Sequence, residues 1–122
     1  MVYAERRVHE LINQERGRRG LGQFRWDGRV YDLAKDHAAE MADQRNLFHS
    51  PNCMIGEYSG ECVWQGKGRI PYGEKLARMI VKSWMGSEQG HKELLLARGA
   101  KKAGVGIWRL RSGVYATWAF RR

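Results

Sequence analysis

The end of the chain restricts the fold more than any other part, because its side chains alternate between two faces as in a β-hairpin. Val105–Leu110 and Val114–Phe120 flank Arg111-Ser112-Gly113, which we expect to form a three-residue turn with a positive φ at the glycine. The second strand places one set of residues on one face and another set on the opposite face: Val114, Ala116, Trp118 and Phe120, against Tyr115, Thr117 and Ala119.

The residues before this hairpin have the 3.6-residue periodicity of helices. We expect a first helix over residues 3–17, ended by Gly20, and a second helix that Asp27 caps and that stops near Arg45. The remaining elements are a short strand near Tyr58–Trp64, a third helix over Glu74–Met85 and a helical turn at Leu94-Leu95-Leu96. Helices followed by a hairpin predict an α+β fold with an antiparallel sheet, in one domain over residues 1–122.

The charge of the chain favours anionic partners. It has 22 basic and 13 acidic residues, a formal net charge of +9, with basic clusters at Arg16-Arg18-Arg19 and Lys101-Lys102. Such a field attracts anionic lipid or acidic polymers, although it also serves solubility alone. No nucleic-acid-binding motif accompanies it, so we expect no specific nucleic-acid binding. No apolar run approaches the ~20 residues that span a bilayer.

Three polar residues outside the helical patterns form the main candidate site. His49 lies in Phe48-His49-Ser50, Glu61 in Gly60-Glu61-Cys62, and His91 follows Gly90 at the start of a helical turn. Side chains in such segments are held by a rigid scaffold and can face a cleft. Two imidazoles and a carboxylate can bind a zinc-like ion or exchange protons.

These motifs, in this order, resemble the CAP superfamily of cysteine-rich secretory, antigen 5 and pathogenesis-related 1 proteins, whose domain is also called SCP. The similar segments span nearly the whole chain: Leu11–Arg16, Gly20-Leu21, Phe24–Asp27, Phe48–Ser50, Gly60–Cys62, Ser83–Ser87 with Gly90-His91, and Gly104–Gly106 with the hairpin. The resemblance implies a three-layer α-β-α sandwich with a cleft, in the compact prokaryotic form. His49, Glu61 and His91 match three of the four cleft residues of the family, and Ser87 falls where its second glutamate would stand.

The resemblance also implies a function. It indicates an extracellular or cell-surface domain in which His49 and His91 hold a divalent ion, zinc first. We favour a monomer, although the sequence does not fix the oligomeric state. Glu61 and Ser87 line the cleft, which binds a lipid, a glycan or an anionic surface polymer. One alternative is a metal-dependent hydrolase with Glu61 as the catalytic base. Another is a structural or adhesive module of a longer surface protein, which would fit the absence of a secretion signal at the start of this sequence.

Cys53 and Cys62 are the two cysteines, and the resemblance favours a disulfide between them in an extracellular protein. A competing hypothesis joins them with His49 and His91 in a Cys₂His₂ zinc site, although the spacing fits no known finger.

Several other residues have structural interpretations. His37 lies on the apolar stripe of the second helix and is predicted to be a core histidine, whereas His9 is predicted to be exposed. Asn13 is predicted to bond backbone groups of a neighbouring loop, and Ser87 is as well suited to cap the following turn as to line the cleft.

Overall fold

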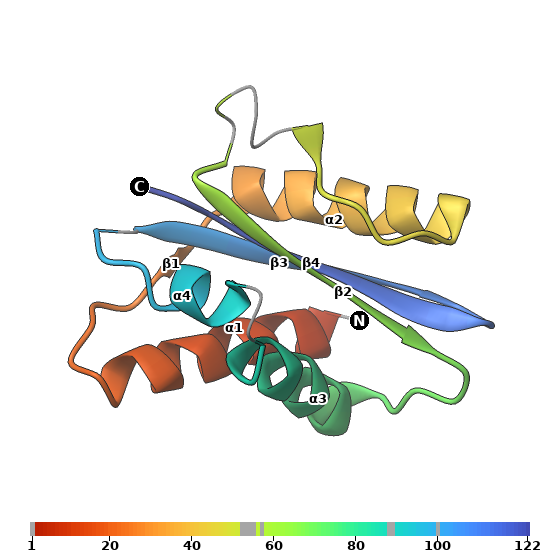
Figure 1. The fold of residues 1–122 in the computed structure, drawn as a ribbon, viewed down its shortest axis with the longest axis horizontal. Helices are drawn as coiled ribbons and strands as arrows, with labels where there is room; N and C mark the ends of the chain where they lie inside the picture. The colour runs from red at the N-terminus through yellow and green to blue at the C-terminus, as the bar shows by residue number, and fades with distance from the viewer. Residues whose placement is uncertain (1, 52–55, 57, 88–89, 100) are drawn as a thin grey trace.

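The protein is described by a computed structural model that covers residues 2–51, 56, 58–87, 90–99 and 101–122. One sheet lies between two helical layers (Figure 1), with α2 (Gly28–Gln44) on one face and α1 (Val2–Gly17), α3 (Gly73–Met85) and α4 (His91–Leu95) on the other. The expected α+β fold and three-layer α-β-α sandwich are therefore confirmed. No helix in the described part of the chain is long and apolar enough to cross a membrane.

The sheet has four strands in the order β1-β3-β4-β2. Strand β4 (Gly113–Arg121) pairs antiparallel with β3 (Lys102–Leu110), as the alternating pattern predicted, and pairs antiparallel with β2 (Gly60–Lys67) on its other side. The two-residue strand β1 (Arg25–Trp26) pairs with β3 in parallel and was not predicted. A strand of two residues is too short to show alternation, so only its place between α1 and α2 could have suggested it.

The turn of the hairpin differs from the prediction. Leu110 pairs directly with Gly113, so Arg111 and Ser112 alone make the turn, and Gly113 belongs to β4 without a positive φ. The glycine is needed for a different reason: a Cβ at Gly113 would lie 2.6 Å from the carbonyl oxygen of Gly66 on β2.

The helix limits follow the sequence signals closely. Asp27 is the N-cap of α2, where its side chain accepts a hydrogen bond from the backbone N–H of Val30, as predicted. The helix ends at Arg45, which takes the left-handed conformation with φ of 52°. This sharp stop turns the chain back along α2 toward the start of β2 (Figure 1), and the returning segment carries His49.

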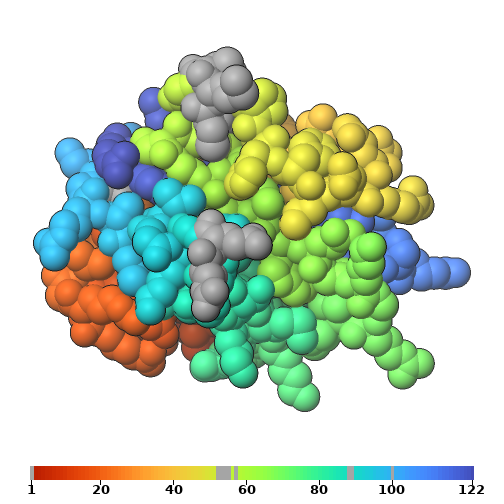
Figure 2. Space-filling model, in the orientation of Figure 1, coloured from red at the N-terminus to blue at the C-terminus, as the bar shows by residue number. Residues whose placement is uncertain are grey.

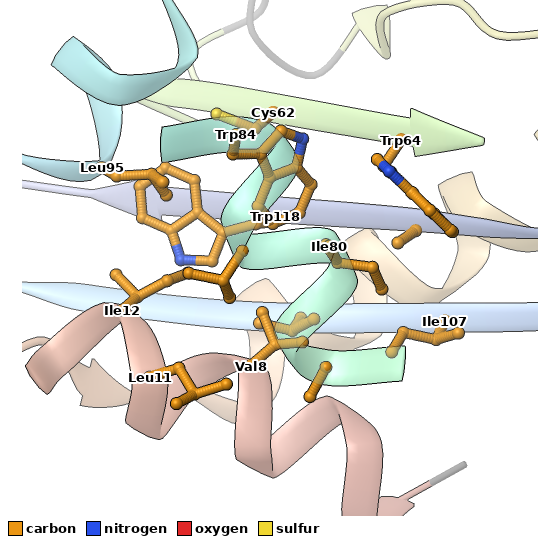
Figure 3. Packing of buried hydrophobic residues seen from close by; sticks show 14 of the residues in the cluster. Val8, Leu11, Ile12, Cys62, Trp64, Ile80, Trp84, Leu95, Ile107 and Trp118 are labelled. Carbon is orange, nitrogen blue, oxygen red and sulfur yellow. The ribbon is translucent and has the colours of Figure 1, made fainter. Parts of the chain in front are cut away.

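The larger hydrophobic core lies between the sheet and the layer of α1, α3 and α4 (Figure 3). Trp84 and Trp118 are fully buried there, as their periodicity predicted, with Val8, Ile12, Ile80, Leu95, Ile107 and Phe120 around them.

On the opposite face of the sheet, α2 lies unusually close to the backbone of β3. Gly104 and Gly106 of β3 let the backbone of α2 approach so closely that a Cβ on either would meet helix backbone at 2.3–2.4 Å.

Two polar residues of α1 are buried at its contact with the segment before α2. Asn13 donates to the carbonyl oxygen of Phe24 at 3.1 Å and accepts from the Phe24 N–H at 2.8 Å, which confirms its structural role. His9, which we expected to be exposed, is only 9% exposed. The prediction was wrong because Trp26, in the unpredicted strand β1, packs its ring against the His9 ring at 5.3 Å between centroids.

The basic cluster expected at Arg16-Arg18-Arg19 does not form an unpaired positive surface. Arg16 is 2% exposed, and Arg18 and Arg19 both pair with Glu15 at 2.7 and 2.9 Å. Arg16 donates to the carbonyl oxygens of Leu95 and Ala97 at 3.0 and 2.9 Å. It therefore ties the end of α1 to the end of α4, the helix that begins with His91.

Candidate functional site

Glu61 is the buried centre of the candidate site. It lies near the start of β2 on the face toward α2, and its side chain is 0% exposed. Its Oε1 accepts a hydrogen bond from the backbone N–H of Ser50 at 2.8 Å and from Nδ1 of His49 at 3.0 Å. Glu61 therefore fixes the segment that follows α2 as well as the His49 ring.

His37 provides a second anchor for the same segment. It is 3% exposed, and its Nε2 lies 2.6 Å from the carbonyl oxygen of Phe48, whose ring packs edge-on against the imidazole. The expected core histidine is thus confirmed, and it has a consequence for the site: His37 holds the residue that immediately precedes His49.

His49 has one ring nitrogen held and the other available. A carboxylate oxygen can only accept, so the nitrogen that faces it, Nδ1, carries the proton in the neutral ring. The lone pair then lies on Nε2, and the side chain is 63% exposed. A buried carboxylate that selects the tautomer of an imidazole is the arrangement commonly found behind histidine ligands of metal ions.

His91 is the first residue of α4, after Gly90, whose positive φ of 94° turns the chain into the helix. The ring is half-buried. Burial, and to a smaller extent the nearby charge of His49, lowers the pKa of His91 below its usual value. The structure therefore brings His49 and His91 within electrostatic range of each other, and the lowered pKa of His91 favours its neutral, metal-binding form.

Cys62 connects β2 to α4 beneath this site. Its thiol is buried and donates to the carbonyl oxygen of His91 at 3.7 Å. Burial, with a smaller effect of Glu61, raises the pKa of the Cys62 thiol. A thiol that resists deprotonation is a poor zinc ligand, which weighs against the Cys₂His₂ hypothesis. Cys53 lies outside the described residues, so its disulfide with Cys62 stays a prediction.

Ser87 lies between α3 and α4, where its backbone N–H donates to the carbonyl oxygen of Trp84 at 3.2 Å. The N-cap of α4 is Gly90, so Ser87 does not cap that helix. Its part in lining the cleft stays a prediction.

His49, Glu61 and His91 do not form a ready-made three-residue metal site in the described part of the chain. Within the described ranges, no three His, Cys, Asp or Glu side chains are grouped to hold an ion. The second oxygen of Glu61, Oε2, is buried and accepts no hydrogen bond from the described residues.

The lowered pKa values of His91 and His9 predict acid sensitivity. Burial lowers the pKa of His9 as well, so both rings resist protonation in the folded state. Below about pH 6.5 the unfolded chain binds protons that the native state does not, and stability must fall with falling pH. Urea unfolding at pH 7.5 and pH 5.5 measures this. His9→Gln should reduce the difference, and an unchanged difference would contradict the role of His9.

The fold and the polar cluster together define a class of small α-β-α sandwich domains with a histidine–glutamate site at the start of an edge strand. The model of the cysteine-rich secretory protein family, CAP, matches residues 9–120, and the chain belongs to this family. The uncharacterized protein YkwD of Bacillus subtilis (strain 168) is 31% identical over 108 residues. That match covers 84% of this chain and 41% of YkwD, so the chain spans less than half of that relative.

Solved structures share the fold. An extracellular protein of Bacillus anthracis that contains an SCP domain superposes with a TM-score of 0.71 at 19% identity, over 98% of this chain and 40% of that one. An outer surface protein of Borrelia burgdorferi gives a TM-score of 0.67 at 20% identity, over 94% of this chain and 90% of that one.

Proposed function

We propose that this chain is an extracellular or cell-surface CAP domain that works as a binding module, with a divalent ion, zinc first, held by His49 and His91. The hydrogen bond from His49 Nδ1 to the buried Glu61 is the observation that supports this most directly, because it directs Nε2 outward. Glu61 acts here as a positioning residue. The ligand class is a lipid, a glycan or an anionic surface polymer, and the ion would supply a Lewis acid at which an anionic or hydroxyl group can bind.

The similar proteins support the location. Two solved structures with this fold are named as extracellular and as outer surface proteins. The chain covers only 41% of YkwD and 40% of the Bacillus anthracis chain, which also suits a domain that works beside others in a longer protein.

One observation favours the hydrolase alternative. Glu61 Oε2 accepts no hydrogen bond among the described residues, and it is the atom that would take a proton if Glu61 were a base. The burial of the whole side chain and the two donors on Oε1 favour a positioning role instead. A general base has to reach the proton that it removes.

Zinc binding is the first test. We expect the double variant His49→Ala with His91→Ala to lose zinc binding in isothermal titration calorimetry at pH 7.5 while keeping its circular dichroism spectrum, because neither side chain is in the core. The affinity of the unaltered protein should fall below about pH 6, where protonated imidazole cannot bind a metal ion. His9→Gln is the matched control, since it removes a histidine elsewhere in the fold. Zinc uptake that the double variant retains would refute the site.

Glu61→Gln separates the two functions. If Glu61 positions His49, zinc affinity should fall roughly ten- to a hundredfold, as for other residues that orient a metal ligand. If Glu61 is instead a base, the variant should bind zinc as tightly as the unaltered protein and lose only a hydrolytic activity. Calorimetry on the variant distinguishes these outcomes without knowledge of the substrate.

A further inference from the structure

The far end of β2 from the histidine site holds a polar cavity of about 480 Å³. It is lined by Arg69 and Tyr72 of the loop between β2 and α3, and by Arg109 and Arg111 at the end of β3 and in the hairpin turn. Figure 1 shows this loop and this turn at the same end of the molecule, and Figure 2 shows their side chains protruding there. Six residues of strand, about 20 Å at 3.3 Å per residue, separate Lys67 at this end from Glu61.

Arg109 is held in place by groups that carry no charge. Its Nη1 and Nη2 donate to the carbonyl oxygens of Ile70 and Pro71, and its guanidinium carbon lies 3.7 Å from the centre of the Tyr72 ring. Its Nε is buried and has no hydrogen-bond partner among the described residues. The guanidinium is therefore fixed in the wall of the cavity, and its charge is not neutralised there.

The positive charge around this cavity is unpaired within the described ranges, unlike that of four arginines elsewhere in the fold. Arg7, Arg18, Arg19 and Arg78 each form an ion pair with a glutamate. No Asp or Glu is among the residues that line this cavity, and no ion pair of its three arginines is formed within the described ranges. Three like charges around one hollow repel one another, and a bound anion would relieve that repulsion.

We propose that this cavity is a subsite for a phosphate-type anion, either inorganic phosphate, a phosphodiester of a surface polymer or a lipid headgroup. Arginine presents several N–H donors in a plane that matches the oxygens of phosphate, and three arginines can surround one such group. Tyr72, 70% exposed, offers a ring against which the organic part of such a ligand can pack. In naming an anionic ligand the proposal rests on the proposed binding function, but it requires no metal ion.

The test follows the arginine Nε–H signals of the EDTA-treated protein by NMR during titration with inorganic phosphate, at constant ionic strength with chloride as the balancing anion. We expect saturable shifts at Arg69, Arg109 and Arg111. The variant Arg69→Gln with Arg111→Gln should bind about tenfold more weakly or worse, from the loss of charge-assisted hydrogen bonds. Arg109 is left in place because it also fastens the loop.

Arg121→Gln with Arg122→Gln is the matched control, because it removes the same charge from the other end of the hairpin and should leave phosphate affinity unchanged within about twofold. Equal weakening in both variants, or shifts that do not saturate, would overturn the proposal.

Phosphatidylglycerol vesicles form the second arm of the test. Vesicle binding that depends on Arg69 and Arg111 assigns the lipid headgroup as the ligand, and phosphate binding without vesicle binding assigns a soluble phosphate or a polymer. The variant His49→Ala with His91→Ala should bind phosphate normally, so a loss of zinc binding can be distinguished from a loss of phosphate binding.

Discussion

Replacing Gly106 by Ala is expected to destabilise the protein by about 3 kcal/mol, at the upper end of the usual cost of overpacking a core. A Cβ at this position would lie 2.3 Å from Cα and 2.4 Å from the backbone nitrogen of Lys35. Both atoms belong to the backbone of α2, so no side-chain rotation can relieve the contact and the whole helix has to move. Urea unfolding monitored by tryptophan fluorescence measures the loss.

Gly17→Ala is the matched control for this substitution. No heavy atom lies within 4 Å of a Cβ built there, and the residue has no positive φ, so the change should leave stability equal or raise it by about 0.4–1 kcal/mol. Similar losses in the two variants would show that α2 does not depend on the close approach to β3.

The same substitution is expected to weaken the candidate metal site. The C-terminal half of α2 contains His37, which lies 2.6 Å from the Phe48 carbonyl oxygen and so holds the segment that carries His49. A helix pushed away from β3 shifts that segment relative to Glu61. We expect lower zinc affinity in Gly106→Ala even where the protein remains folded, whereas Gly17→Ala should bind zinc normally.

The elements that the sequence predicted well are those in which one periodicity extends over many residues. The apolar stripe of α2 buries one face of the helix and the apolar run of β4 is buried on both faces, so each pattern is visible without any knowledge of its partners. The limits of α2 were also predicted, because Asp27 bonds a backbone group only three residues away. Such signals are local in the sequence.

The features that were missed depend on residues far apart in the chain. Arg16 looked like part of a basic surface, and its burial follows only from the carbonyl oxygens of Leu95 and Ala97. Gly113 looked like a turn glycine, and the atom that excludes a Cβ there belongs to Gly66 of another strand. A sequence pattern shows how polar or how small a residue is, but not which distant group it contacts.

The candidate site was predicted only in part. His49, Glu61 and His91 could be chosen from their motifs and from the family resemblance, and the structure joins His49 to Glu61 by a hydrogen bond. The chemical roles of these three residues were harder to predict from the sequence than their positions. The sequence placed Glu61 in the cleft and offered a catalytic base only as an alternative role, and its complete burial and the Ser50 N–H on its Oε1 favour a residue that orients the imidazole.

One edge of β3 is bonded by a buried ion pair. Strand β1 pairs only with Lys102 and Ala103, so beyond them this edge of β3 has no neighbouring strand in the described part of the chain. At Ile107 two side chains take the place of that strand: Glu5 Oε2 accepts from the backbone N–H at 2.8 Å, and Lys35 Nζ donates to the carbonyl oxygen at 2.7 Å. Glu5 and Lys35 also pair with each other at 2.8 Å, so α1, α2 and β3 meet in one polar network.

We expect Glu5→Ala to cost about 3–5 kcal/mol, the usual effect of removing one partner of a buried ion pair. Glu5 is 1% exposed, and its loss leaves the Ile107 N–H without an acceptor, Lys35 without its counter-ion and the Tyr31 hydroxyl without the carboxylate oxygen 3.2 Å away. Chemical unfolding of the variant measures the effect. Glu15→Ala is the control, because the Glu15 pairs with Arg18 and Arg19 are exposed and such pairs contribute about 1 kcal/mol or less.

The double variant Glu5→Met with Lys35→Met tests whether the damage comes from the unpaired charge. Replacing both partners by apolar residues of similar length should recover much of the stability lost in Glu5→Ala, because no charge is then left without its partner. The peptide of Ile107 would still lack its two side-chain partners, and an uncovered strand edge is a site for pairing with another chain. We therefore expect the double variant to be more stable than Glu5→Ala but to self-associate in size-exclusion chromatography. A variant that is stable and monomeric would show that Glu5 and Lys35 do not protect this edge.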